Sequence, residues 1–227
     1  MIDTRPIIEP AIMADEWETL VVQIEKIAKS ATHIQIDVMD GVFVPSRSFP
    51  YNETAFDEQQ IPYSDTINFG VHLMVQNPQI VGHQFIQAGV KRVVAQIEGF
   101  REGSASRIFN EWKQSGVQTG VALLLDTPLS VIDPLIENGD VSTVQVMSIA
   151  RVGYQGEKFD ERALVRIRDI RTRYPDVTIA VDGGVNRETL QSLLDAGANV
   201  FGIGSAIMQQ ENPEDVLKDF TNTYHAH

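Results

Sequence analysis

The chain has no cysteine among its 227 residues. This absence excludes disulfides, thiolate metal sites and cysteine nucleophiles. Positive charge is also scarce, because 18 Lys and Arg residues stand against 31 Asp and Glu residues and the formal net charge is −13. No cluster of Lys and Arg follows a helix or a stripe of the sequence. We therefore expect neither a nucleic-acid partner nor binding to an anionic membrane.

Long apolar runs are missing as well. No stretch offers the ~20 consecutive apolar residues that a membrane-spanning helix needs. Residues 1–10 mix acidic and basic side chains without a long apolar segment, which is not the pattern of a secretory signal. A cytoplasmic protein is therefore expected. With 43% hydrophobic residues, the chain has enough apolar side chains for a sizeable buried core.

Apolar runs rich in Val and Ile alternate with amphipathic segments along the whole chain. The amphipathic segments carry apolar residues three and four positions apart, which predicts helices. Repetition of a strand and a helix is typical of a (β/α)8 TIM barrel, and we predict one such domain over residues 1–227. A doubly wound open sheet is the alternative, but its Gly-x-Gly-x-x-Gly turn is missing from residues 8–18. The eight expected strands lie near residues 7–13, 32–39, 67–75, 92–98, 118–125, 142–149, 178–182 and 200–204.

Local signals mark the expected ends of helices. A capping side chain precedes a proline at Asn77, Thr127 and Asn212, which predicts helices that begin at these prolines. A glycine follows several periodic segments, where a left-handed residue ends a helix. These glycines are Gly89, Gly116, Gly139 and Gly197. Residues 45–66 contain Pro, Ser, Asn and charged residues, so we predict an elaborated loop with only a short helix near 53–60.

Four short motifs that bear chemistry stand at the ends of apolar runs. A parallel barrel gathers the carboxyl ends of its strands on one face, so residues far apart in the sequence meet there. Two aspartates, a histidine and paired glycines are thus expected to form one site. The motifs occupy residues 35–41, 71–74, 181–184 and 202–205.

These motifs resemble those of the ribulose-phosphate 3-epimerases, which are metal-dependent barrels of the ribulose-phosphate-binding type. The likeness runs nearly from end to end of the chain, and its motifs follow in the same order. It rests on Pro10, Ile12 and Asp15, on residues 37–41, 43–45 and 72–75, on Gly156, Lys158 and Phe159, and on residues 181–185 and 204–207.

The resemblance implies proton transfer at a carbon next to a carbonyl. Asp37 and Asp182 align with the two acid and base groups of the family, which also bind a divalent metal that stabilises an enediolate. His72 then corresponds to a metal ligand. The substrate pocket implied in the same way is lined by Met39, Met74, Met147, Gly153 and Gly156.

Paired glycines after the seventh and eighth runs predict a phosphate site. Backbone amides and a short helix N-terminus there can hold a dianion without any lysine, which an acidic chain requires. The alternative is that these glycines only permit tight turns. The residues concerned are Gly183, Gly184, Gly204 and Ser205.

The chain departs from the family at several positions near this site. Gln35 stands where the family has a histidine ligand, Ala11 where it has a serine, and Gln96 where it has another histidine. A glutamine carbonyl suits Mn²⁺ or Mg²⁺ better than Zn²⁺. The implied cofactor is one divalent metal ion, with Zn, Fe, Mn and Co left open and Gln35 as its fourth candidate ligand. The loop at residues 151–157 also differs in charge and length.

The resemblance predicts an epimerase that acts at C3 of a phosphorylated ketose and interconverts ribulose 5-phosphate and xylulose 5-phosphate. Three alternatives stay open: another phosphoketose such as allulose 6-phosphate, a related decarboxylation or aldol chemistry, and a phosphosugar-binding barrel without catalysis. The lysine-centred acid cluster that the second alternative needs is not visible in the sequence. Association into a homo-oligomer also stays open, because no expected helix shows an unambiguous apolar outer face.

Overall fold

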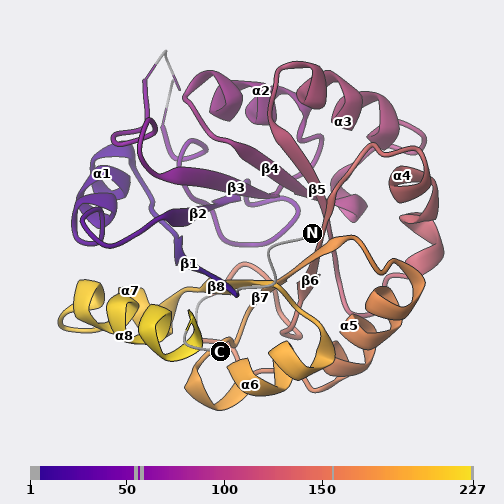
Figure 1. The fold of residues 1–227 in the computed structure, drawn as a ribbon. Coiled ribbons are helices and arrows are strands. Elements are labelled where there is room, and N and C mark those ends of the chain that lie inside the picture. Colours follow the sequence, from indigo (N-terminus) through magenta and orange to yellow (C-terminus); the bar gives the residue numbers. More distant parts are fainter. Residues whose placement is uncertain (1–5, 54–55, 57–58, 155, 226–227) are drawn as a thin grey trace.

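Eight parallel strands close into a barrel in sequence order, with the helices arranged around it (Figure 1). The computed structural model describes residues 6–53, 56, 59–154 and 156–225. Each strand pairs with the next one along the chain, and β1 pairs with β8. The strands are β1 (Ile7–Ile12), β2 (His33–Met39), β3 (Asn68–Met74), β4 (Arg92–Gln96), β5 (Gln118–Leu123), β6 (Thr143–Met147), β7 (Thr178–Asp182) and β8 (Val200–Ile203).

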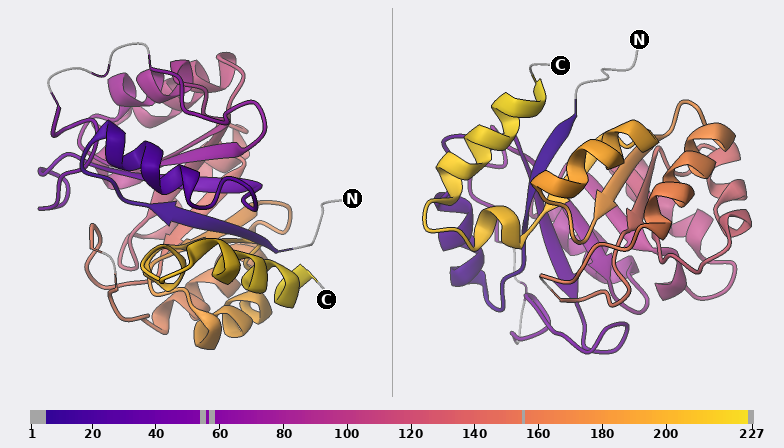
Figure 2. Two further views of the ribbon diagram at one scale, coloured as in Figure 1. Left: turned by 90° about the vertical axis from the view of Figure 1, so that its left-hand side faces the viewer. Right: turned by 90° about the horizontal axis from the view of Figure 1, so that it is seen from below.

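Helices follow the strands and cover the outside of the barrel, as the two turned views also show (Figure 2). Short 3₁₀ turns at Ile97–Gly99 and Leu129–Val131 occupy two of the connections. The α-helices are α1 (Trp17–Glu25), α2 (Gln79–Gln87), α3 (Ala105–Gln114), α4 (Asp133–Glu137), α5 (Arg162–Arg173), α6 (Arg187–Ala196), α7 (Ser205–Met208) and α8 (Pro213–His225).

The predicted TIM barrel is confirmed, and every predicted strand is present with ends within two residues of the prediction. The alternation of apolar and amphipathic segments was a strong signal, because each parallel strand is buried on both faces. The glycine stop signals are confirmed too. All four glycines adopt the left-handed conformation just after a helix, with φ between +70° and +107°.

Two of the three predicted helix starts are wrong. Asn77 is itself left-handed, with φ +53°, and its side-chain oxygen accepts a hydrogen bond from Arg101, so Pro78 takes the N-cap position and α2 begins at Gln79, one residue after the prediction. Thr127 donates its hydroxyl to Glu98 and leads into a 3₁₀ turn rather than α4. Only α8 begins at its proline, Pro213. In the first two cases a contact with a neighbouring loop outcompetes the local capping signal.

The predicted loop at residues 45–66 packs an aromatic side chain into the core. Phe49 is 1% exposed, and its ring centroid lies 5.4 Å from that of Trp17 and 4.8 Å from that of Phe56. The loop therefore belongs to the core between α1 and α2. Four positions of the short helix expected near 53–60 lie outside the described residues.

The barrel interior is polar, whereas the layer between strands and helices is apolar. At the end where the strands begin, Glu9 and Arg92 form a buried ion pair inside the barrel. Gly70 permits this packing, because a Cβ there would lie 2.9 Å from the Arg92 guanidinium. Further along, glutamines, a histidine and two aspartates point inward. The polar interior leads directly to the site at the other end of the barrel.

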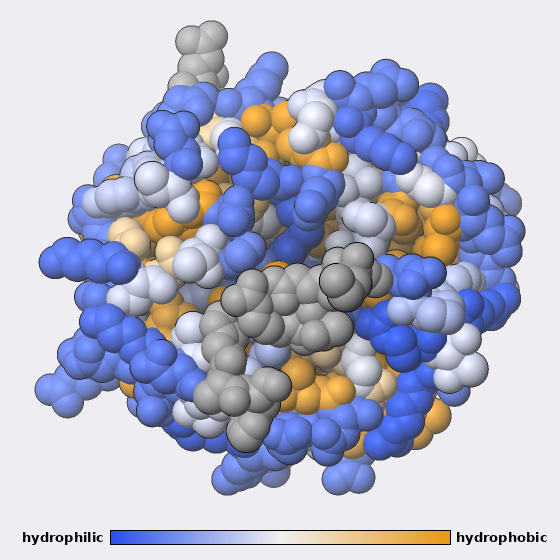
Figure 3. Space-filling view, viewed as in Figure 1, coloured by the Kyte–Doolittle hydropathy of each residue, from blue (hydrophilic) through white to orange (hydrophobic). Residues whose placement is uncertain are grey.

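No helix in the described ranges is long and apolar enough to cross a membrane. The face viewed in Figure 3 is mostly hydrophilic, with apolar residues in separate patches.

The contact between α2 and α3 supports a prediction on stability. A Cβ at Gly82 would lie 2.3 Å from Cζ2 of Trp112, which is fully buried. Alanine favours a helix over glycine by about 1 kcal/mol, but overpacking typically costs about 1–3 kcal/mol. We expect Gly82→Ala to lower the free energy of unfolding, measured by urea denaturation. The exposed Gln87→Ala in the same helix is the control, and a stabilised Gly82→Ala would contradict the prediction.

Candidate active site

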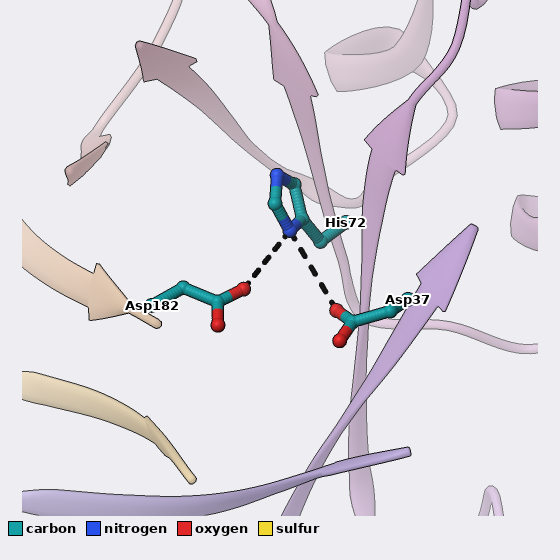
Figure 4. Close-up of side chains that lie close together, drawn as sticks. All are labelled: Asp37, His72 and Asp182. Carbon is teal, nitrogen blue, oxygen red and sulfur yellow. Dashed lines mark hydrogen bonds and ion pairs between the residues drawn. The ribbon is translucent and has the colours of Figure 1, made fainter. Parts of the chain in front are cut away.

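Three side chains meet inside the barrel near the carboxyl ends of β2, β3 and β7 (Figure 4). Asp37 and His72 are register partners on adjacent strands, and Asp182 is the last residue of β7. Nδ1 of His72 lies 3.0 Å from Oδ2 of Asp182 and 3.6 Å from Oδ1 of Asp37. All three are at least 91% buried, with exposed fractions of 0%, 9% and 6% for His72, Asp182 and Asp37. The structure therefore brings the predicted acid pair and histidine together.

Three buried glutamines surround this cluster. Gln35 lies two residues before Asp37 on β2 and thus on the same face of the strand. Its Nε2 donates hydrogen bonds to Oδ1 of Asp37 (2.9 Å) and Oδ2 of Asp182 (2.7 Å). Gln145 on β6 donates to the same oxygen of Asp182 (3.2 Å), and the Nε2 of Gln96 on β4 lies 3.1 Å from Nε2 of His72. The cluster is thus lined by the side-chain amides of three buried glutamines.

The close carboxylates shift the acidity of the cluster. Burial raises the pKa of Asp37, and the charge of Asp182 raises it further, to about 6, against opposing hydrogen bonds from His72 and Gln35. Burial alone would lower the pKa of His72. Hydrogen bonds to Asp182 and Asp37 and their charges outweigh this effect and raise the pKa of His72 to about 9. Between these values, and in the absence of a metal, His72 is an imidazolium and Asp37 a carboxylate.

A pocket opens above the cluster, and both aspartates line it. Eight of the other predicted site residues line the same pocket: Met74, Met147, Gly153, Gly156, Gly183, Gly184, Gly204 and Ser205. Met39 does not itself line the pocket, but it is fully buried beside Met74, which does, in a small apolar cluster that also contains Val44. His72 and Gln35 lie beneath the pocket, behind the carboxylates. The pocket therefore has an acid floor, formed by Asp37 and Asp182, and a glycine-rich wall, formed by Gly183, Gly184, Gly204 and Ser205.

The wall after β7 requires glycine for steric reasons. Gly183 and Gly184 are left-handed, with φ +104° and +66°. A Cβ at Gly183 would lie 2.7 Å from Ile149, and one at Gly184 would lie 2.8 Å from the Phe159 backbone. The carbonyls of this turn are held by protein donors, since that of Gly183 accepts from Ser148 and that of Gly184 accepts from Asn186 and Thr189.

Sequence reasoning missed several polar groups near the pocket. Gln145 interrupts an apolar strand two residues before Met147, and this spacing was a usable signal, because it places both side chains inside the barrel. Ser148 donates to the backbone carbonyl of Asp182 (3.1 Å) and so ties the end of β7 to β6. Glu157 lines the pocket and pairs with Arg151 on the same loop. Only the folded loop reveals this pair.

The donor set fits a divalent cation. Ligand atoms of Asp37, His72 and Asp182 all lie within 4.8 Å of one another. Donors held about 2.1 Å from one ion are about 3.0 to 3.4 Å apart at neighbouring coordination positions, close to the spacings of Nδ1 from the two carboxylates. The charged side chains that line the pocket are all acidic. Asp37, Asp182 and Glu157 line it, and none of its described lining residues is Lys or Arg.

Comparison with known proteins places this arrangement in a family. The sequence profile described as "Ribulose-phosphate 3 epimerase family" matches residues 7–208. The chain belongs to the ribulose-phosphate 3-epimerase family. It is 30% identical to the ribulose-phosphate 3-epimerase of Bacillus subtilis, over 93% of this chain and 96% of that protein. It is 27% identical to the ribulose-phosphate 3-epimerase of Candida glabrata, over 94% of this chain and 90% of that protein. The expected enzyme class, a carbohydrate epimerase, is thereby confirmed.

Solved structures outside this family share its fold. The 3-hexulose-6-phosphate synthase of Salmonella typhimurium superposes with a TM-score of 0.72 at 17% identity, over 97% of this chain and 99% of that one. KGPDC from Streptococcus mutans in complex with D-R5P superposes with a TM-score of 0.74 at 12% identity, over 96% of this chain and 98% of that one. At this identity the likeness concerns the barrel architecture alone.

The His72 environment predicts a pH dependence of stability in chelator-treated protein. Because the pKa of His72 is about 9 in the folded state and about 6.5 when unfolded, its stabilising effect is complete below pH 6.5 and is lost by pH 9. We expect the free energy of unfolding to fall by up to about 3 kcal/mol across this window. Urea denaturation with EDTA measures it, and His72→Asn should flatten the slope. An equal slope in both proteins would contradict the assignment to His72.

Proposed function

We propose that this member of the ribulose-phosphate 3-epimerase family inverts C3 of a phosphorylated ketose and interconverts D-ribulose 5-phosphate and D-xylulose 5-phosphate. The observation that carries the proposal is the pair of buried carboxylates, Asp37 and Asp182, at the floor of one pocket. They come from β2 and β7 and so reach the pocket from different sides. Inversion of a carbon next to a carbonyl requires a proton acceptor on one face and a proton donor on the other.

Each carboxylate has one oxygen held and one oxygen available. Among the described residues, the hydrogen bonds to these side chains go to Oδ1 of Asp37 and Oδ2 of Asp182. Oδ2 of Asp37 and Oδ1 of Asp182 then serve the substrate. One, in its ionised form, takes the proton from C3; the pair of the broken C–H bond forms a C2=C3 double bond while the carbonyl pair moves to the C2 oxygen, and an enediolate forms. The other, protonated when the substrate binds, gives its proton to the opposite face of C3 as the C2 carbonyl forms again, and the direction of reaction decides which acid acts as base.

The residues present fit one divalent cation held by Asp37, His72 and Asp182, with Gln35 next to them. When bound, such an ion supplies positive charge that stabilises the enediolate oxygens. His72 and the glutamines keep the two carboxylates in place. Met74 and Met147 line the pocket with apolar surface, which limits access of water to the reacting carbon.

The glycine wall is the proposed phosphate site. Gly183 and Gly184 follow β7, and Gly204 and Ser205 follow β8, so the two turns lie side by side at the end of paired strands. Carbonyls of the first turn are engaged by the protein, which leaves the backbone amides to bind an anion. A backbone site suits this pocket, because its described lining residues include no Lys or Arg.

Proton NMR in D₂O tests substrate and chemistry together. Metal-stripped protein is mixed with ribulose 5-phosphate, and the measurement is repeated after addition of Mn²⁺, Fe²⁺, Co²⁺ or Zn²⁺. Formation of xylulose 5-phosphate with deuterium at C3 supports the proposal. Turnover of allulose 6-phosphate in its place would change the substrate assignment. Binding of either sugar without exchange under every metal would favour a phosphosugar-binding barrel and overturn the proposed activity.

Removal of either carboxylate gives a sharper test. We expect Asp37→Asn and Asp182→Asn each to lower kcat by at least about a thousandfold, since each removes one proton-transfer step. The far-ultraviolet circular dichroism should stay unchanged. The control is Asp140→Asn, which alters an equally buried acid before β6, and we expect it to lower stability but keep turnover. Retained turnover in either aspartate variant would refute the two-carboxylate mechanism.

The phosphate site predicts an effect on substrate binding. Ser205 stands at the first position of α7 and lines the pocket. A carboxylate there would repel a phosphate dianion at close range, so we expect Ser205→Asp to raise KM by at least about tenfold. Ser205→Ala, which adds no charge, should change KM much less. Steady-state kinetics and competition by inorganic phosphate measure the effect, and equal KM values in both variants would place the phosphate elsewhere.

A further inference from the structure

Gln35 occupies an unusual position between the two acids. Its Nε2 lies 2.9 Å from Oδ1 of Asp37 and 2.7 Å from Oδ2 of Asp182. His72 Nδ1 approaches the same two oxygens, at 3.6 Å and 3.0 Å. Both nitrogens therefore contact the same two carboxylate oxygens. Gln35 is 2% exposed, so water cannot take its place freely.

The amide of Gln35 can present either of two atoms at this place. Its NH₂ group donates hydrogen bonds, which two carboxylates need when no cation lies between them. Rotation of the terminal amide by 180° exchanges Nε2 for Oε1 without moving the rest of the side chain, because this torsion is roughly two-fold. Oε1 is a neutral oxygen donor of the kind that binds hard cations. The same side chain thus suits the cluster with and without a metal.

We infer that Gln35 is a two-state metal ligand, which holds the aspartates through Nε2 in the metal-free enzyme and binds the ion through Oε1. Compared with a site that has histidine at this position, this site then binds Mn²⁺ more strongly relative to Zn²⁺. The inference rests on the proposed metal-assisted function. It assigns the choice of ion to one residue of this chain.

The ligand chemistry explains the direction of the preference. With Gln35 the candidate donors are three oxygens and one imidazole nitrogen, whereas histidine at this position would give two nitrogens and two oxygens. Imidazole favours Zn²⁺, while carboxylate and carbonyl oxygens favour Mn²⁺ and Mg²⁺. The structure leaves room for the amide to turn, since the neighbouring residue is Gly202, whose Cβ, if present, would lie 3.4 Å from Nε2.

Metal titration of the full chain tests the inference without reference to catalysis. Metal-stripped protein is titrated with Mn²⁺ and with Zn²⁺ alone. Isothermal titration calorimetry gives both dissociation constants, and electron paramagnetic resonance counts free Mn²⁺. We expect Gln35→Leu to weaken Mn²⁺ binding at least about tenfold, because a ligand is lost. We expect Gln35→His to shift the ratio of the two constants toward Zn²⁺ by at least about tenfold.

Gln145→Leu is the matched control. Gln145 is an equally buried glutamine whose Nε2 donates to the same oxygen of Asp182, but it does not lie between the two acids. This variant should keep the ratio of the two dissociation constants within about threefold of wild type. A shift as large as that of Gln35→His would overturn the inference, because any change near Asp182 would then alter the preference.

Two further outcomes separate this inference from the proposed function. Unchanged Mn²⁺ affinity in Gln35→Leu, or failure of the wild type to bind either ion, would overturn the metal role of Gln35. Epimerisation in the NMR experiment would then still stand as evidence for the activity. If Gln35→Leu does not fold, the ratio measured for Gln35→His decides alone, since histidine keeps a polar group at this position.

Discussion

Repulsion between two carboxylates buried in one barrel is the constraint on which the rest of the site depends. Asp37 and Asp182 approach closely enough to share hydrogen bonds from one amide nitrogen of Gln35. Against the effect of burial, hydrogen bonds to the two acids and then their charges raise the pKa of His72 to about 9, while burial and then the charge of Asp182 raise the pKa of Asp37 to about 6. The described lining of the pocket offers no Lys or Arg to relieve this repulsion. The groups that remain to offset the repulsion are the imidazole of His72, the amide donors and a divalent cation.

The barrel keeps this unfavourable arrangement in place through ties at the strand ends. Ser48 donates to the carbonyl of Asp37 and accepts from the amide of Met39, which anchors the end of β2. Asp40 accepts hydrogen bonds from the amides of Val42, Phe43 and Gln76 and so links the ends of β2 and β3. Ser148 does the same for β6 and β7. Their buried hydrogen bonds fix backbone positions, so the acids cannot move apart to reduce repulsion.

Charged side chains and glycine turns occupy separate parts of the pocket. The floor, from β2, β3 and β7, supplies charged and amide side chains, whereas the wall after β7 and β8 offers backbone groups of glycine turns. This separation suits a substrate with a phosphate at one end and a carbon acid at the other. A chain with net charge −13 gains little from long-range attraction of such an anion. Under the proposed function, recognition of the anion therefore depends on short-range contacts with backbone amides.

The sequence by itself determined the barrel, because eight doubly buried strands leave a periodic apolar signal that few folds share. It also located Asp37, His72, Asp182 and the glycine turns, since chemistry at strand ends must converge in a parallel barrel. The helix starts predicted after Asn77 and Thr127 were wrong, because hydrogen bonds between these side chains and distant loops replace local capping. The tertiary structure alone showed the amide of Gln35 between the acids, the donation from Gln145 and the burial of Met39 behind the pocket-lining Met74. These features depend on distances across the barrel, which no spacing along the chain encodes.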